Sequence, residues 1–264
     1  MNASELYRAG RLSEAIAAQI EVVRDRQDNE SRLFLFELYY FAGELERARK
    51  QLVAIRYEDP MKQLAVEAYQ KCLIAQEKRQ QLFKGVQPSF PANPPAHLVY
   101  RWQTIEAIRH GNLDEASKLM ALANESSPVG KINVNGQVVE TFRDADDLLA
   151  SVVEVFLQDR YMWIPLEQIY GLTIKSNPPQ TPRDLILAQA VIRLTPDVDI
   201  GVFLPVLYPD SENHPDPNIK LGRYTDWVQV TEGIIRGVGL KTFIVGDGDS
   251  TMLELRTIEG IVEK

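Results

Sequence analysis

A six-residue pattern that returns at a nearly constant spacing constrains the fold of the first half of this chain. The pattern is Gly-x-Leu-x-x-Ala, and it begins at Gly10, at Gly43 and at Gly111. The first two copies lie 33 residues apart (10 to 43), and the next step is 68 residues (43 to 111), or two steps of 34. A step of about 34 residues is typical of tetratricopeptide-type helix–turn–helix units. Each glycine ends one helix in the left-handed conformation, so the spacing predicts stacked helix pairs.

The stretch between the second and third copies departs from this pattern. Asp59-Pro60 is a helix start, and the apolar stripe that includes Leu64 and Cys72 predicts one long helix without the Gly-x-Leu signature. Residues 85–95 hold four prolines and predict an extended connector. The helical array is therefore expected to be degenerate.

The character of the chain changes after Glu125. Asn135-Gly136, between the β-type runs 131–134 and 137–142, predicts a hairpin with a type I′ turn. Asp144 is expected to cap a helix whose core face carries Leu148, Val152 and Phe156, and Thr181 to Asp184 predict a short helix. Further β-type runs lie at 162–164, 190–194, 201–207, 227–230, 234–235, 241–245 and 252–257.

These patterns predict an α+β protein. Degenerate tetratricopeptide-like helical repeats over residues 1–125 would precede a mixed domain over residues 126–264, built on a small antiparallel sheet or a partly closed barrel.

Charge and cysteine content narrow the classes of function. The chain holds 29 Lys and Arg against 37 Asp and Glu, a net charge of −8 without a basic cluster, so we expect neither nucleic acid nor a membrane surface as a partner. The single Cys72 excludes an internal disulfide and any multi-cysteine metal site. The N-terminus lacks the pattern of a signal peptide and no apolar run is long enough to span a bilayer, so a cytoplasmic location is expected.

The sequence contains none of the common catalytic and cofactor-binding motifs. G-x-S-x-G, Walker A and G-x-G-x-x-G patterns are missing, and none of the three histidines has a second His or Cys at metal-ligand spacing. We therefore expect no catalytic residue, cofactor or metal. One enzymatic alternative stays open: a hydrolase that uses His214 as general base with Asp210 or Asp216, which requires these side chains to converge in a pocket.

The string Leu221-Gly222-Arg223-Tyr224-Thr225-Asp226-Trp227 is the most unusual in the chain. Two interpretations are open. Arg223, Asp226 and Trp227 form a contact surface for a protein partner, or Arg223 and Asp226 bond to each other while Trp227 enters the core.

Five strings in this order resemble the ImpE/SciE family, also called TagJ, of accessory proteins encoded with bacterial type VI secretion systems. They are Trp163-Ile164-Pro165, Pro182-Arg183-Asp184-Leu185, Leu204-Pro205-Val206-Leu207-Tyr208, Leu221 to Trp227, and Gly237-Val238-Gly239. The resemblance implies a protein–protein role, similar to that of the adaptor that binds the N-terminal helix of the small sheath subunit. It implies no catalytic residue and no cofactor.

Together these observations predict a non-enzymatic cytoplasmic adaptor that receives an amphipathic helix in a groove. The other alternative is a tetratricopeptide-like adaptor for an unrelated cytoplasmic partner. The predicted contact residues are Tyr7, Tyr39, Tyr40 and Trp102 in the helical half, and Arg223, Asp226 and Trp227 in the other half.

Overall fold

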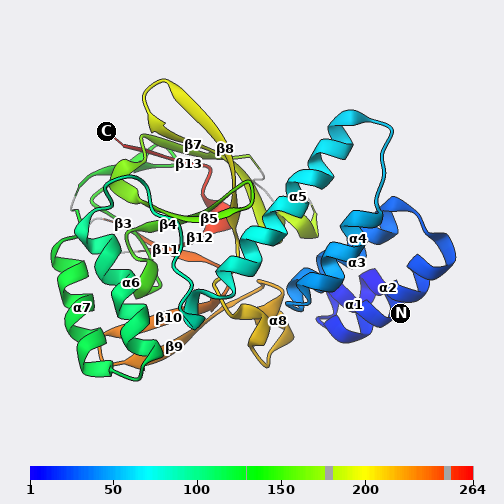
Figure 1. Ribbon diagram of the computed structural model, residues 1–264, viewed down its shortest axis with the longest axis horizontal. Helices are drawn as coiled ribbons and strands as arrows, with labels where there is room; N and C mark the ends of the chain where they lie inside the picture. Colours follow the sequence, from blue (N-terminus) through cyan, green and yellow to red (C-terminus); the bar gives the residue numbers. More distant parts are fainter. Residues whose placement is uncertain (129, 176–180, 247–250, 264) are drawn as a thin grey trace.

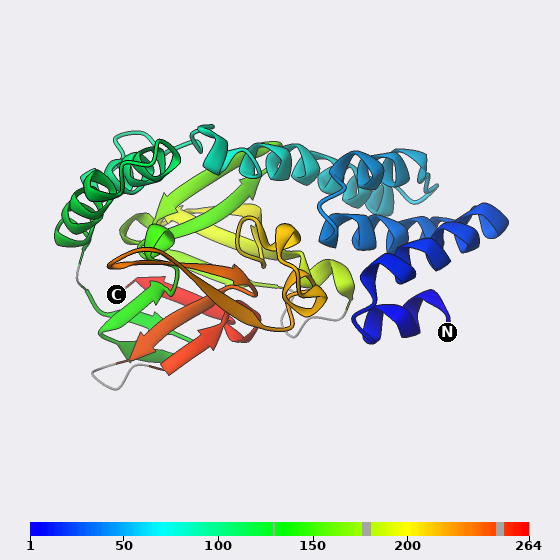
Figure 2. The ribbon, with the colours of Figure 1, turned by 90° about the horizontal axis from the view of Figure 1, so that it is seen from below.

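Helices and sheets occupy different parts of the molecule. The computed structural model describes residues 1–128, 130–175, 181–246 and 251–263. Figures 1 and 2 show helices α1–α4 extending away from a C-terminal body of strands, α5 running from them onto β4 and β5, and α6 and α7 covering one side of that body. No helix in the described ranges is long and apolar enough to cross a membrane.

The predicted helix pairs are confirmed. Gly10, Gly43 and Gly111, with φ of +76°, +72° and +76°, join α1 to α2, α3 to α4 and α6 to α7. The alanines of the pattern are fully buried, as close helix packing requires. The helices are α1 (Ala3–Arg8), α2 (Leu12–Arg26), α3 (Asn29–Phe41), α4 (Leu45–Ala54), α5 (Pro60–Arg79), α6 (Ala96–Arg109), α7 (Leu113–Glu125) and the short α8 (Pro217–Lys220).

The long helix α5 and the connector that follows it also agree with the prediction. Asp59 caps α5 by accepting a hydrogen bond from the backbone N–H of Met61 at 2.8 Å. After a 3₁₀ turn, η1 (Leu82–Lys84), the connector lies along β5 (Arg160–Pro165). Its Ser89 N–H donates to the Tyr161 carbonyl and its carbonyl accepts from the Trp163 N–H, both at 3.0 Å. These bonds attach the helical part to the sheet.

The strands form open antiparallel sheets. Within the described residues, eight strands pair in the order β2-β1-β13-β6-β7-β8-β4-β5, three in the order β12-β11-β3, and β10 with β9. The α+β class is confirmed, and the large sheet does not close into a barrel. The remaining strands are β1 (Ile132–Val134), β2 (Gln137–Val139), β3 (Thr141–Asp144), β4 (Val152–Leu157), β6 (Gly171–Ile174), β7 (Leu187–Thr195), β8 (Val198–Pro205), β9 (Thr225–Thr231), β10 (Ile234–Gly239), β11 (Thr242–Gly246), β12 (Thr251–Glu254) and β13 (Gly260–Glu263).

The helix expected after Asp144 is wrong. Asp144 ends β3, a 3₁₀ turn (η2, Asp147–Leu149) follows, and Val152 and Phe156 lie in β4. A spacing of four residues places two side chains on one face of a helix, but also on one face of a strand. Tertiary burial decides between the two, since five of the six residues of β4 are buried. The hairpin at Asn135-Gly136 and the capped turn η4 (Pro182–Leu185) are confirmed.

One core cluster joins the helical half to the strands. It includes Phe36 and Leu73 of the helices together with Phe156, Trp163 and Tyr208 from the other half. A second cluster packs residues of the eight-stranded sheet against residues of β3 and β11. The division into residues 1–125 and 126–264 stays a prediction.

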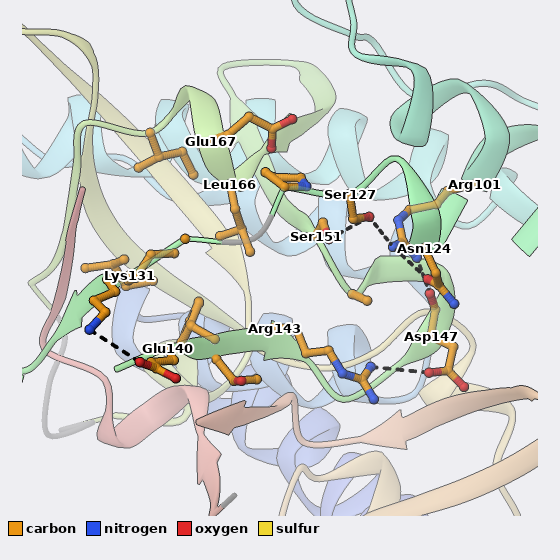
Figure 3. Close-up of a pocket in the computed structure, with 18 residues that line it drawn as sticks. Arg101, Asn124, Ser127, Lys131, Glu140, Arg143, Asp147, Ser151, Leu166 and Glu167 are labelled. Carbon is orange, nitrogen blue, oxygen red and sulfur yellow. Dashed lines mark hydrogen bonds and ion pairs between the residues drawn. The ribbon is translucent and has the colours of Figure 1, made fainter. Parts of the chain in front are cut away.

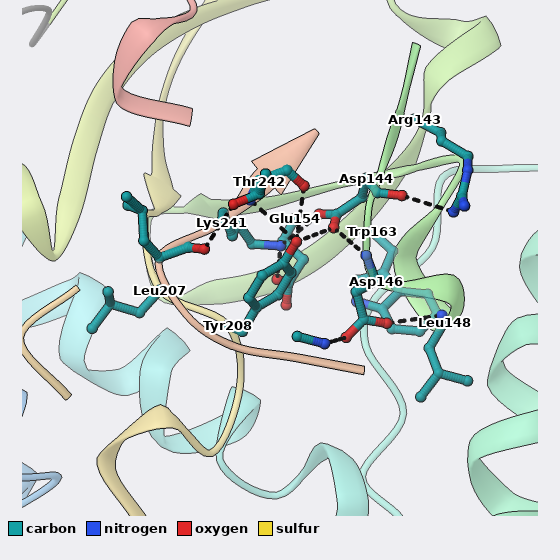
Figure 4. Close-up of polar contacts among 12 residues, drawn as sticks. Arg143, Asp144, Asp146, Leu148, Glu154, Trp163, Leu207, Tyr208, Lys241 and Thr242 are labelled. Atoms are coloured by element: carbon teal, nitrogen blue, oxygen red, sulfur yellow. Dashed lines mark hydrogen bonds and ion pairs between the residues drawn. The ribbon is translucent and has the colours of Figure 1, made fainter. Parts of the chain in front are cut away.

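Four buried side chains of alternating charge connect α5 to the sheets, and we call them the buried charge chain: Arg79, Glu154, Lys241 and Asp144 (Figure 4 labels the last three). Arg79 donates to both carboxylate oxygens of Glu154 at 2.8 Å. The Lys241 Nζ lies 2.9 Å from Glu154 and 3.0 Å from Asp144. Burial alone would raise the pKa of Glu154, but Arg79 and Lys241 hold it below its ordinary value.

Replacing Glu154 by Gln is expected to lower the free energy of unfolding by about 3–5 kcal/mol, because the buried Arg79 then loses its carboxylate partner and Lys241 keeps only Asp144. Asp199→Asn is the matched control, since the exposed Arg193–Asp199 pair should contribute about 1 kcal/mol or less. Urea denaturation followed by circular dichroism measures both. Equal losses for the two variants would contradict this role of the buried charge chain.

Glu37 of α3 generates a prediction about pH. Its side chain is 5% exposed and pairs with the Nε of Arg183 at 2.9 Å. Burial raises its pKa from 4.5 to about 8, against the opposing effect of Arg183. Between about pH 5 and 8, Glu37 is therefore protonated in the folded protein but ionised in the unfolded chain. Glu37 thus makes the free energy of unfolding fall as pH rises through this range. With Glu37→Gln, this fall should shrink by about 1–3 kcal/mol between pH 5 and 9. If the free energy of unfolding of the wild type and of Glu37→Gln changes equally with pH, the raised pKa of Glu37 is excluded.

Candidate functional site

The predicted contact residues of the helical half do not share one surface. Tyr39 and Tyr40 of α3 are only 3% and 6% exposed, and Tyr39 lies beneath the Arg47 guanidinium, 4.3 Å from its ring centroid. Tyr7 of α1 packs against Phe34 and Phe41, and Trp102 lies partly buried on α6, against the core. A partner would reach the two buried tyrosines only after their neighbours move, and the contact role of all four residues stays a prediction.

The contacts of residues 221–227 differ in part from both interpretations of this string. Arg223 donates to the Tyr7 carbonyl at 2.6 Å and to the Asn218 side-chain oxygen at 3.0 Å, so it ties this string to α1. Asp226 pairs with the His214 Nε2 at 3.3 Å. Trp227 is 36% exposed. The interpretation with an Arg223–Asp226 bond and a core Trp227 is therefore wrong, and contact through these residues stays a prediction.

The side chains of the alternative hydrolase do not converge. His214 pairs with Asp226, while the Asp210 carboxylate lies 3.3 Å from Arg236. The Asp216 carboxylate accepts from the Asn218 backbone N–H at 2.8 Å and so caps α8. Neither predicted carboxylate orients His214 as a general base, because both have structural partners.

Exposed apolar side chains gather on the two-stranded ribbon β9–β10. Tyr224, just before β9, and Trp227, Val228 and Ile235 are exposed by 63%, 36%, 45% and 43%, and we call these four residues the ribbon surface. The strand register places Trp227 and Ile235 on one face of the ribbon and Val228 on the other. In the described chain β9 pairs only with β10, so its other edge is open. An open strand edge beside exposed apolar residues is a typical protein-binding feature.

The glycines of β10 hold the ribbon close to the protein body. A Cβ on Gly237 would lie 2.3 Å from the Tyr208 ring, and one on Gly239 would lie 2.2 Å from the Tyr224 carbonyl oxygen. The Gly237 N–H donates to Asp146 at 3.0 Å. A side chain at position 237 would therefore push the ribbon away from Tyr208, and one at position 239 would collide with the Tyr224 backbone next to β9.

A cavity of about 500 Å³ lies between α6–α7 and β3, and we call it the α7–β3 cavity (Figure 3). Its apolar wall includes Phe142, Leu166, Ile169 and Ile261. Polar side chains line the rest, among them Arg101 of α6, Asn124 of α7 and Arg143 of β3. Sequence reasoning missed the cavity because its residues are spread from 101 to 261 and form no motif. Among the described residues, no group of three or more His, Cys, Asp or Glu could hold a metal ion.

Comparison with known proteins shows which family has this architecture. The family model described as ImpE protein matches residues 136–259. A Pseudomonas aeruginosa protein, type VI secretion system accessory component TagJ, is 28% identical over 98% of this chain and 91% of its own length. The crystal structure of protein VPA1032 from Vibrio parahaemolyticus shares the fold, with a TM-score of 0.86 at 21% identity over 98% of this chain and 96% of that one. The resemblance read from the sequence is thus confirmed: this chain is similar to the ImpE family model over residues 136–259 and to TagJ over nearly its whole length.

Proposed function

We propose that this protein is a non-enzymatic cytoplasmic adaptor of a type VI secretion system that binds the amphipathic N-terminal helix of the small sheath subunit. The observation that carries the proposal is the likeness to the Pseudomonas aeruginosa accessory component, which extends over 98% of this chain. A likeness of that extent includes both the helix pairs and the ribbon β9–β10, so it supports a shared role for the whole architecture.

The ribbon surface supplies the apolar contact in this proposal. A partner helix would bury its apolar residues at positions i, i+3, i+4 and i+7 against Trp227 and Ile235, which share one face of the ribbon. Trp227 is suited to be the anchor because large aromatic side chains dominate the energetics of protein interfaces. Asp226 is 57% exposed beside it and would belong to the polar rim that sets the register of the helix.

Binding of a labelled synthetic peptide of the sheath subunit's N-terminus, followed by fluorescence anisotropy, tests the proposal. The wild-type protein should bind with a Kd of about 50 μM or tighter. Trp227→Ala should weaken binding by about tenfold or more, because the anchor is lost. Tyr170→Ala is the matched control, since Tyr170 is an aromatic residue 47% exposed outside the ribbon surface and should change little.

The absence of binding by the wild-type protein would sink the proposal. The alternative of an adaptor for an unrelated cytoplasmic partner would then be favoured if wild-type protein, but not Trp227→Ala, retains a different protein from a lysate of the native host.

A further inference from the structure

The α7–β3 cavity has a polar end and an apolar wall. Figure 3 shows Arg101, Asn124, Ser127 and Ser151 close together near the Arg143–Asp147 pair, while Lys131 and Glu140 pair at the opposite side. Its volume of about 500 Å³ falls in the range of small-molecule sites, roughly 300–1,000 Å³. Sites of that kind combine apolar walls with a few convergent polar groups.

Arg101 is a buried cation at the polar end, only 1% exposed. Its guanidinium donates to neutral acceptors: the Asp147 backbone carbonyl, the Asn124 side-chain oxygen at 3.2 Å and the Ser127 hydroxyl at 3.1 Å. Among the described residues no carboxylate lies within ion-pair distance of it, and its Nε has no hydrogen-bond partner. A buried charge without an opposite charge beside it is unfavourable, so this end of the cavity favours an anion.

The neighbouring carboxylate is already fully used. Asp147 binds Arg143 through one oxygen at 3.2 Å and accepts from the Ile235 N–H through the other at 2.8 Å. The Asp147 carboxylate therefore pairs with Arg143 and leaves Arg101 without an ion-pair partner among the described residues. Burial, and next the repulsion from Arg143, lower the pKa of Arg101 to about 10, as expected for an excess of positive charge.

Hydroxyls and apolar side chains complete the site. The Ser151 hydroxyl donates to the Ser127 hydroxyl at 3.2 Å, and both residues line the cavity next to Arg101. Glu167, the remaining acidic residue of the lining apart from Glu140 and Asp147, is hydrogen-bonded to the His97 ring at 2.6 Å. The wall of Phe142, Leu166, Ile169 and Ile261 offers no partner for a polar group, so it selects an apolar body.

We propose that the α7–β3 cavity binds a carboxylate carried on a short apolar body, with the carboxylate at the Arg101–Arg143 end and the apolar body against the wall of Phe142 and Leu166. A free small carboxylic acid and an acidic side chain of a bound protein segment share this chemistry. The site goes beyond the adaptor role, because it requires no particular sheath partner.

The test uses the full chain with phenylacetate and phenylacetamide, which have nearly the same shape but differ in charge. Isothermal titration should give a Kd of about 1 mM or tighter for phenylacetate and a Kd at least tenfold weaker for phenylacetamide. Arg143→Gln should weaken phenylacetate binding at least fivefold and leave phenylacetamide unchanged. Its side chain is 37% exposed, so this variant should fold.

Arg193→Gln is the matched control, because it removes an arginine from an exposed ion pair on β7 and should not alter binding. The proposal would be overturned by any of three results: phenylacetate and phenylacetamide bind equally well, Arg143→Gln binds phenylacetate as the wild type does, or phenylacetate does not saturate the protein at about 10 mM.

A competition arm distinguishes the two sources of the carboxylate. Displacement of phenylacetate by the sheath peptide supports an acidic side chain of the partner as the occupant. Simultaneous binding of peptide and phenylacetate supports a free acid. Failure of the peptide to bind at all would refute the adaptor proposal and leave the phenylacetate result, and hence the cavity proposal, unaffected.

Discussion

The buried ion pairs around Glu154 constrain the rest of the structure. Charges taken out of water are unfavourable unless each meets an opposite charge in good geometry. Arg79 and Lys241 meet that condition only if the end of α5, the strand β4 and the start of β11 come together at one point. Asp144 extends the requirement to β3 and accepts from the Tyr208 hydroxyl at 2.6 Å. The orientation of the helical half on the sheets thus follows from charge neutralisation as well as from apolar burial.

The ribbon surface and the α7–β3 cavity are connected through the turn η2. Asp146 and Asp147 accept hydrogen bonds from the Gly237 and Ile235 N–H groups, which hold β10. The same Asp147 binds Arg143, and its carbonyl accepts from Arg101 inside the cavity. Displacement of the ribbon by a partner would therefore remove two hydrogen bonds from the turn that lines the polar end of the cavity. The two proposed sites share one structural support.

Sequence reasoning succeeded where local chemistry decides the conformation. A glycine at a helix end, an Asn-Gly turn and the capping residues at Thr181 and Asp184 act through backbone geometry within a few residues. It failed after Asp144, because the apolar spacing of Val152 and Phe156 suits a helix and a strand equally. For the site, Trp227 was singled out and is exposed, whereas Arg101 was overlooked because an arginine inside a helix carries no local signal.

The sequence by itself determined the helix pairs, the presence of a β-rich second half and the resemblance to the ImpE family, because these depend on short patterns and on their order along the chain. Only the tertiary structure decided that Arg223 binds the Tyr7 carbonyl rather than Asp226, and that Arg101 lies beside a cavity without a carboxylate partner among the described residues. Such contacts join residues that are far apart in the sequence; Arg223 and Tyr7 are separated by 216 positions. They therefore depend on how separately formed elements pack against each other.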